Sequence, residues 1–169
     1  MGTMINPFPY APDCSAIWTM LVERDIGAFL EMVEDDFIAE GFFGLHAQFK
    51  PRPDDRIMAF PELSRYRDKW LRQANRIANV AYAEPLRPAI FRPTDLSVID
   101  IVGERAVARK KFNGVIARAD GGAEKFDCQT LYFCTKRDDA WKITNFAICR
   151  VFLVKATCRR CTHKWIMFA

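Results

Sequence analysis

The spacing of apolar and polar positions along the chain changes near residue 93. Before that point, apolar residues recur mainly every three or four positions, which is the spacing of helices that bury one side. After it, the chain consists of runs rich in β-branched and aromatic side chains, separated by short polar turns, which is typical of strands. Helices followed by closely spaced strands indicate an α+β domain with the helices on one face of an antiparallel sheet.

Three helices are expected in the first half of the chain. The first covers residues 15–24 with Ser15 as its N-cap, and the second covers residues 25–37 with Asp25 as its N-cap. A brief strand at 37–44 follows. The third and clearest helix lies within residues 61–80. Its apolar stripe consists of Leu63, Tyr66, Trp70, Ala74 and Ile77.

Two segments rich in proline interrupt these elements. Residues 45–61 contain three prolines and predict a long irregular loop, such as a lid or a binding loop. Residues 84–93 predict a connector broken by proline. Four strands follow, at 94–102, 105–118, 125–135 and 140–152. We therefore expect an extended arm at 1–14, one domain at 15–152 and a tail at 153–169.

The last two strands carry large apolar groups on both faces. If the four residues after Thr135 form the turn, Thr135 lies opposite Ala140, and alternation assigns every side chain to a face. One face mixes apolar bulk with isolated polar groups, which is typical of a ligand pocket. Its members are Cys128, Thr130, Tyr132, Cys134, Trp141, Ile143, Asn145, Ala147 and Cys149. The other face has an apolar centre inside a charged rim, which is typical of an interface between subunits. This centre consists of Leu131, Phe133, Phe146 and Ile148.

Three stretches of this sequence resemble the nuclear transport factor 2-like superfamily, and within it the SnoaL-like group. They are LEMVEDDFIAEG, with Asp35-Asp36-Phe37 after the second helix, YRDKWLRQ in the long helix, and AWKITNFAICRV in the last strand. In the last of these, Asp139, Trp141 and Ile143 form an Asp-x-Trp-x-Ile pattern. The resemblance covers residues 15–152. It implies a cone: a strongly curved antiparallel sheet wrapped around a long helix, often dimeric through the outer face of the sheet.

The resemblance does not select one reaction, because this fold carries isomerases, dehydratases, hydrolases, cyclases and binding domains. The position of the steroid isomerases' base falls on Gly41, beside Glu40. Their buried acid falls near Thr130, and their tyrosine near Ile17 or Trp18. Neither of the two carboxylates that enolisation would use is therefore matched.

Candidate catalytic residues are Glu40 and His46. Glu40 is either a base whose pKa is raised by burial in the mouth of the cone, or a solvated carboxylate at the end of a strand. His46 is either a general acid or base on a lid, or a surface histidine without a role.

Candidate ligand-binding residues are Trp18, Tyr66, Arg109, Thr130, Tyr132 and Asn145. Thr130, Tyr132 and Asn145 are either a group that holds a carbonyl or hydroxyl ligand, or satisfied polar groups of the core. Trp18 and Tyr66 are aromatic residues either of the pocket wall or of the hydrophobic core. Arg109 binds an anion if its side of the strand faces inward, and is otherwise solvated.

Composition excludes several classes of function. The net charge of +4 is too small and too scattered for a nucleic-acid interface, and no apolar run is long enough to span a membrane. The N-terminal residues do not resemble a signal peptide, so a cytoplasmic location and reduced cysteines are expected. Cys158, Cys161 and His163 supply three ligands where zinc usually takes four, so neither a metal nor a cofactor is expected.

These observations predict a homodimer that binds a small apolar or polycyclic molecule inside the cone. The alternative is a cofactor-independent cyclase, dehydratase, isomerase or hydrolase that acts by acid–base catalysis. A third interpretation is a structural subunit resembling the small chain of aromatic-ring dioxygenases, which would require a large partner.

Overall fold

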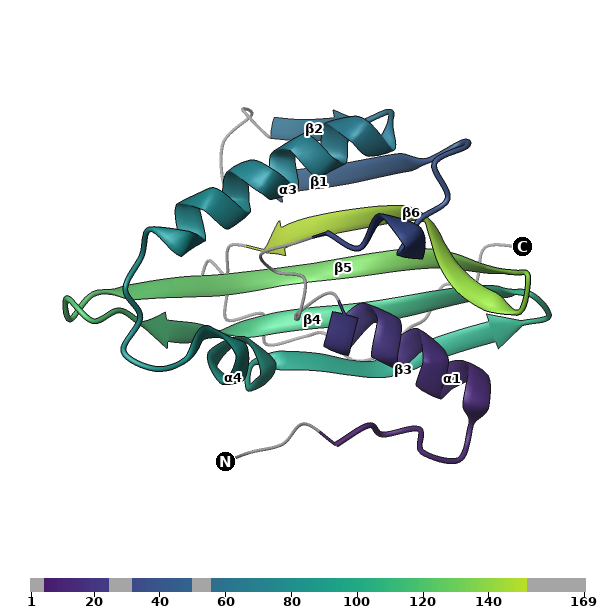
Figure 1. Ribbon diagram of the computed structural model, residues 1–169, viewed down its shortest axis with the longest axis horizontal. Coiled ribbons are helices and arrows are strands. Elements are labelled where there is room, and N and C mark those ends of the chain that lie inside the picture. Colours follow the sequence, from purple (N-terminus) through teal and green to yellow (C-terminus); the bar gives the residue numbers. More distant parts are fainter. Residues whose placement is uncertain (1–4, 25–31, 50–55, 152–169) are drawn as a thin grey trace, which may run out of the picture.

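Six strands form one strongly curled sheet with the order β2-β1-β6-β5-β4-β3 (Figure 1). The computed structural model describes residues 5–24, 32–49 and 56–151 of the chain. The strands are β1 Phe43–Phe49, β2 Arg56–Phe60, β3 Thr94–Val102, β4 Arg105–Ala117, β5 Ala123–Arg137 and β6 Ala140–Val151. The four strands that the sequence predicts after residue 93 form a consecutive antiparallel meander. β1 runs parallel to β6, so the complete sheet is mixed.

The helices cover one face of this sheet, and the α+β cone is confirmed. Helix α1, Pro12–Trp18, and the short helix α4, Leu86–Phe91, lie over β3 and β4, and α3, Leu63–Ala78, lies over β1 and β2 (Figure 1). α1 continues directly into a π-helical turn at Thr19–Arg24. No helix of the described ranges is long and apolar enough to cross a bilayer.

The first helix begins earlier than the sequence pattern predicts. Ser15 lies inside α1, and Ala11 is the N-cap residue. Pro12 occupies the first helical position, where its fixed φ angle is favourable and its missing N–H has no intrahelical acceptor to lose. Residues 12–14 therefore belong to the helix and not to the arm. Asp25 and most of the second predicted helix lie outside the described residues. The described part of that segment is a 3-10 turn at Glu34–Asp36.

The prediction of a long irregular loop at 45–61 is wrong. Residues 43–49 and 56–60 are strands β1 and β2, and they pair with each other in antiparallel register from Gly44–Phe60 to Gln48–Arg56. Proline was a misleading indicator because Pro51 and Pro53 fall between the two strands and Pro61 follows the second. A proline outside a strand removes no hydrogen bond from the strand's ladder.

The apolar stripe of α3 packs against the sheet as predicted. Tyr66, Ala74 and Ile77 are buried, and Leu63 and Trp70 pack partly buried against the core. Tyr66 is the centre of an aromatic cluster, since its ring centroid lies 4.4 Å from that of Phe146 and 5.4 Å from that of Phe60. These contacts fix the long helix against β6 and β2.

A two-residue turn joins β5 to β6, where the sequence suggested four residues. Arg137 pairs with Ala140, and the turn residues Asp138 and Asp139 both have positive φ angles, 50° and 59°. Such angles at both positions are those of the type I′ turn that suits the twist of a hairpin. Thr135 consequently lies opposite Lys142. The difference from the expected register is two residues, so the turn alone leaves every side chain on its predicted face.

Candidate functional site

The β5 half of the predicted two-faced hairpin is confirmed. Thr130, Tyr132 and Cys134 are buried on the face that the helices cover, which we call the inner face. Leu131 and Phe133 alternate with them and therefore point to the outer face. Burial raises the pKa of the Cys134 thiol to about 12, so this cysteine is a neutral apolar residue of the core.

The β6 half changes face at a β-bulge. Phe133 pairs with Asn145, but the next residue, Cys134, pairs with Ile143, so Thr144 is an extra residue without a partner position in β5. The described side chains of β6 beyond the bulge, at residues 145–148, therefore lie on the faces opposite to their predicted ones. Phe146 is only 2% exposed on the inner face, and Ile148 packs against the core. The prediction that Phe146 and Ile148 lie on the outer face is therefore wrong, because both belong to the inner face.

Asn145 lies on the outer face, and its predicted place in the inner pocket is wrong. Its side-chain oxygen accepts a 2.9 Å hydrogen bond from the backbone N–H of Phe43, at the start of β1. The Thr144 hydroxyl donates a 2.9 Å hydrogen bond to the Phe133 carbonyl. The two side chains thus stabilise the bulge and fix the position at which β1 joins β6.

A row of polar side chains crosses the inner face. The strand register places His46 of β1 beside Ile148 of β6, Ile148 beside Thr130 of β5, and Thr130 beside Lys110 of β4. Neighbouring strands lie about 4.8 Å apart, so the backbones of Thr130 and Lys110 are about 5 Å apart and those of Thr130 and His46 about 10 Å apart. We call His46, Thr130 and Lys110 the polar row.

Lys110 is the member of this row that the sequence analysis missed. Its ammonium donates a 3.1 Å hydrogen bond to the carbonyl of Leu21, in the π-helical turn, and lies 5.3 Å from the centroid of the Tyr132 ring. A cation at that distance over a tyrosine ring is attracted by the ring electrons. Alternation along β4 could have identified Lys110, because it shares its side of the strand with the small apolar residues Ala106 and Ala108, both buried.

Arg109 lies on the other side of the same strand. It pairs with Leu131 of β5 and Val98 of β3, and its side chain is on the outer face. Arg109 is therefore separated from Thr130 and Tyr132 by the sheet itself. Arg109 was expected to bind an anion only if its side of the strand faced inward. Its side faces outward, so Arg109 is not placed to bind an anion inside the cone.

His46 is a buried strand residue and not part of a lid. It is 8% exposed, in the middle of β1. Glu40, in contrast, is exposed in the turn before β1, next to Gly41, which has a φ angle of 71°. The structure brings His46 and Thr130 onto one face, and it leaves Glu40 in a surface turn.

Trp18 and Tyr66 belong to the hydrophobic core cluster. Trp18 is buried in the last turn of α1, and Tyr66 is buried among the aromatic rings of α3 and the sheet. Both face the same side of the sheet as the polar row. They supply the apolar surroundings in which the polar row lies.

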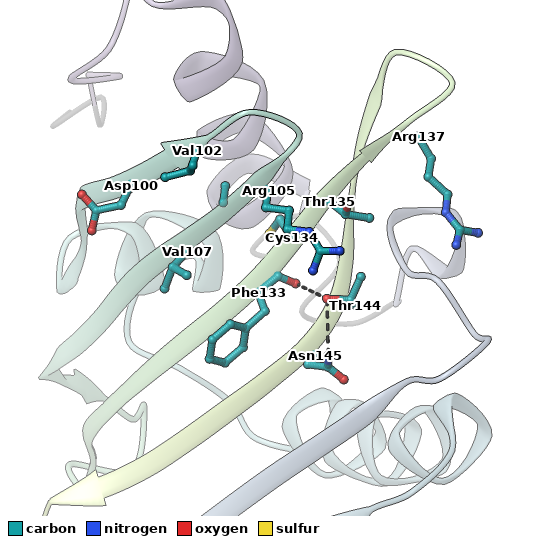
Figure 2. A pocket seen from close by; sticks show the side chains of 11 residues that line it. Asp100, Val102, Arg105, Val107, Phe133, Cys134, Thr135, Arg137, Thr144 and Asn145 are labelled. Atoms are coloured by element: carbon teal, nitrogen blue, oxygen red, sulfur yellow. Dashed lines mark hydrogen bonds between the residues drawn. The ribbon is translucent and has the colours of Figure 1, made fainter. Parts of the chain in front are cut away.

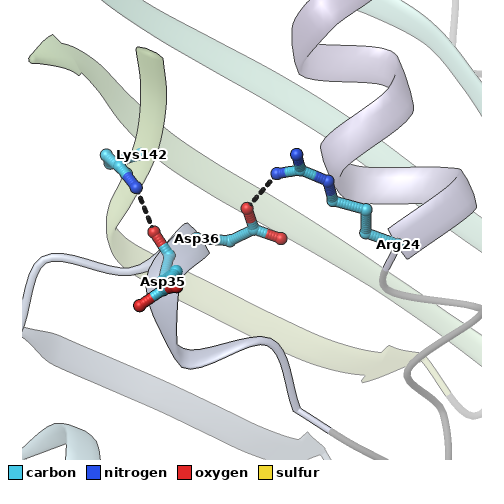
Figure 3. A network of polar contacts seen from close by, with 4 residues as sticks. All are labelled: Arg24, Asp35, Asp36 and Lys142. Atoms are coloured by element: carbon cyan, nitrogen blue, oxygen red, sulfur yellow. Dashed lines mark hydrogen bonds and ion pairs between the residues drawn. The ribbon is translucent and has the colours of Figure 1, made fainter. Parts of the chain in front are cut away.

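The residues that carry the family resemblance have structural roles. Asp36 is buried and forms an ion pair with Arg24, and the Lys142 ammonium donates a hydrogen bond to the Asp35 carbonyl (Figure 3). Burial raises the pKa of Asp36, and the Arg24 guanidinium opposes this effect only in part. These contacts join the π-helical turn, the 3-10 turn and β6.

Trp141 of the Asp-x-Trp-x-Ile pattern fixes α1 against the hairpin. Its indole N–H donates a 3.0 Å hydrogen bond to the Asp13 carboxylate, and Lys136 donates a 3.1 Å hydrogen bond to the same oxygen. The bond from Trp141 and then that from Lys136 hold the pKa of Asp13 below its usual range. Ile143 of the same pattern forms an isolated bridge with Phe37. The motif thus determines the fold and not a reaction.

Within the described ranges, no group of three or more histidine, cysteine or acidic residues is placed to hold a metal ion. Cys158, Cys161 and His163 lie outside these ranges.

No protein-family profile and no curated protein sequence matches the chain, whereas solved structures do. A nuclear transport factor 2-like protein of unknown function from Methylobacillus flagellatus is 18% identical, with a TM-score of 0.52, over 87% of this chain and 98% of the other. A domain of unknown function with a cystatin-like fold from Nostoc punctiforme is 12% identical, with a TM-score of 0.54, over 87% and 81%. A proposed scytalone dehydratase from Novosphingobium aromaticivorans is 15% identical, with a TM-score of 0.51, over 81% and 83%.

The curled sheet and its one-sided helices define an α+β cone protein. Likeness at these identities concerns the fold, and the fold is the nuclear transport factor 2-like one that the sequence motifs predict. The fold alone does not select a function.

Proposed function

We propose that this protein binds a small, largely apolar molecule on the inner face of the cone, with the polar end of the molecule at the polar row. The observation that carries the proposal is the alignment of His46 of β1, Thr130 of β5 and Lys110 of β4 in one register row, with Ile148 of β6 between His46 and Thr130, on a face whose buried side chains are mainly apolar. Apolar walls with a few convergent polar groups are the usual construction of a site for a small molecule. A cytoplasmic location stays a prediction from the sequence.

The polar row favours a ligand with a carbonyl, hydroxyl or carboxylate group. The Lys110 ammonium has three donors and no acceptor, and the Thr130 hydroxyl both donates and accepts. A ligand oxygen between Thr130 and Lys110 would receive a hydrogen bond from each. The Tyr132 ring beside the Lys110 ammonium supports this geometry, because it holds the cation at the inner face.

The test is a ligand screen with two lysine variants that differ by one position. Steroid-like, polyketide-like and terpenoid compounds are screened by thermal shift, and the Kd of each hit is measured by calorimetry. Lys110→Met removes the ammonium on the inner face, whereas Lys111→Met removes the same charge from the exposed side of the same strand. We expect Lys110→Met to weaken binding about tenfold or more, as the loss of one hydrogen bond to a charged group would, and Lys111→Met to have little effect.

Thr130→Val supplies the second comparison. Valine has nearly the shape of threonine and lacks only the hydroxyl, so we expect weaker binding of compounds with a polar end and unchanged binding of purely apolar ones. Hits that bind all three variants equally well would place the ligand elsewhere and contradict the proposal.

The burial of His46 favours a second candidate, a cofactor-independent enzyme that acts by acid–base catalysis. A histidine in the same row as Thr130 and Lys110 could transfer a proton to or from a ligand held by them. If this is correct, a bound hit is turned over, and His46→Gln abolishes turnover without abolishing binding. Binding without turnover for every hit would favour the first candidate.

A further inference from the structure

The outer face of the sheet carries a groove at the end where β5 turns into β6. The groove has a volume of about 490 Å³ and lies over β3, β4, β5 and β6, on the side opposite to the helices (Figure 2). The bulge in β6 forms one side of it, since the unpaired Thr144 and the adjacent Asn145 both line the groove. The groove is therefore distinct from the inner face and its polar row.

The floor of the groove is apolar and accessible. Phe133 is 40% exposed, and Val107 of the neighbouring strand is 37% exposed. Val102, at the end of β3, is 82% exposed on the rim. The Phe133 ring lies on the open side of β5 in Figure 2, next to Val107. An aromatic ring and two valines provide a surface on which a flat apolar group can stack.

The cationic groups of the groove have no partner among the described residues. Arg105 and Arg137 both line it, and within residues 5–24, 32–49 and 56–151 neither guanidinium forms a hydrogen bond or an ion pair. Figure 2 shows the Arg105 guanidinium directed across β5 toward Thr144. Asp100 is the one acidic residue of the lining, so the groove carries a net positive charge.

We propose that this groove binds a small organic anion with a flat apolar body, such as an aromatic carboxylate or sulfonate. The apolar body lies on Phe133 and Val107, and the acid group is held by Arg105. A guanidinium offers two parallel N–H donors that match the two oxygens of such a group, and it is weakly hydrated, so stacking and pairing occur together. The Thr144 hydroxyl is committed to the Phe133 carbonyl, so it stabilises the shape of the groove and is not the anion's main contact.

The experiment uses naphthalene-2-sulfonate as the anionic probe and naphthalene-2-sulfonamide as its neutral counterpart. Each is titrated into the 15N-labelled full chain, and backbone amide shifts give both the Kd and the location. We expect saturable shifts from the sulfonate at residues of the groove on β4, β5 and β6, and binding of the neutral probe about tenfold weaker. Shifts confined to the inner face, or equal affinity for both probes, would overturn the proposal.

Three variants distinguish the paired N–H donors of the Arg105 guanidinium from positive charge in general. Arg105→Gln removes the guanidinium, and Lys111→Gln removes one positive charge from the exposed side of the same strand, outside the groove. We expect Arg105→Gln to weaken the sulfonate about tenfold, Arg105→Lys to restore it only partly, and Lys111→Gln to change it less than twofold. If Arg105→Gln and Lys111→Gln weaken sulfonate binding equally, the sulfonate is attracted by positive charge in general, and the proposed site is wrong.

A second copy of the chain is the competing occupant of this face. Sedimentation velocity on the same samples decides between them. If the chain is a dimer, if Phe133→Asp makes it a monomer, and if the sulfonate binds neither form in the groove, the groove is an interface between copies and the proposed anion site is wrong.

Discussion

Tyr132 and Phe146 lie opposite each other in β5 and β6 with ring centroids 6.4 Å apart, both on the inner face of the sheet. This pairing exists only because of the bulge at Thr144. Without the extra residue, Phe146 would share a face with Phe133, on the opposite side of the sheet. One unpaired residue thus decides which phenylalanine belongs to the core and which to the surface.

The first prediction compares these two phenylalanines. Phe146→Ala removes a buried ring that contacts Tyr66, Phe42 and Phe60, so we expect the free energy of unfolding to fall by about 3–5 kcal/mol. Phe133→Ala, on the outer face, should cost less than about 1 kcal/mol. Urea unfolding of both variants measures the difference. Equal losses would contradict the face assignment.

Gly44 provides an independent test of the position of the Phe146 ring. A Cβ atom at residue 44 would lie 2.4 Å from the ring Cζ of Phe146, which is buried and has little room to move. We expect Gly44→Ala to destabilise the protein by about 1–3 kcal/mol through overpacking. In a Phe146→Leu background the same substitution should cost much less, so a double-mutant cycle should show a favourable coupling. Additive losses would place the ring elsewhere.

Asp13 should make stability depend on pH in the acid range. Its pKa is lowered in the folded protein by the Trp141 indole, so the folded state binds fewer protons than the unfolded state near the unfolded pKa of about 3.9. Stability from this group is present above that pH and is lost as the pH falls through the lowered pKa. Asp13→Asn should therefore lose less stability on acidification than the parent chain, as measured by urea midpoints between pH 3 and 7.

Asp36 should change the stability with pH in the opposite direction. Burial raises its pKa, so the folded state keeps a proton that the unfolded state loses above about pH 3.9. Its contribution to stability therefore falls as the pH rises through the raised pKa. Asp36→Asn should remove this decline, whereas Arg24→Ala should steepen it, because the carboxylate then loses the opposing cation. Parallel pH profiles for Asp13→Asn and Asp36→Asn would refute both assignments.

The expected homodimer can be tested on the apolar residues that remain on the outer face. Leu131 and Phe133 lie there, whereas Phe146 and Ile148 do not. If a second copy covers this face, Leu131→Asp should shift the sedimentation coefficient from dimer to monomer, because an interface core tolerates an unpaired charge poorly. Lys111→Asp, at an exposed position of β4, is the control for added negative charge. If the parent chain sediments as a monomer, the prediction of a homodimer is wrong.

The sequence predicted those features that depend on a regular spacing of side chains. The stripe of α3 agrees with the structure because its pattern continues unbroken through the helix, and β3 covers the predicted residues even though its register shifts between Asp95 and Val98. The faces of β5 and the first residues of β6 were also correct. The error begins at Thr144, where a bulge interrupts the alternation, and no residue type in the sequence marks a bulge at that position.

The remaining errors arise from contacts between distant segments. His46 lies in a strand because β1 pairs with β6, and that pairing joins residues far apart in the chain. Local composition indicated a loop, since the prolines between and after the strands dominated the pattern. Lys110 was missed for another reason: its ammonium is stabilised by the Leu21 carbonyl and the Tyr132 ring, and neither partner is adjacent to it in sequence.

The parallel pairing of β1 with β6 has a consequence for synthesis on the ribosome. Phe43 and Asn145, whose hydrogen bond starts this pairing, are 102 residues apart. The β1–β2 hairpin therefore emerges long before the strand that completes it, and one of its edges stays open until the C-terminal hairpin has been made. Contacts of such long sequence separation form slowly, and open strand edges promote aggregation. Docking of β1 onto β6 is consequently a late folding event, and the nascent chain is most exposed to association with other chains before it occurs.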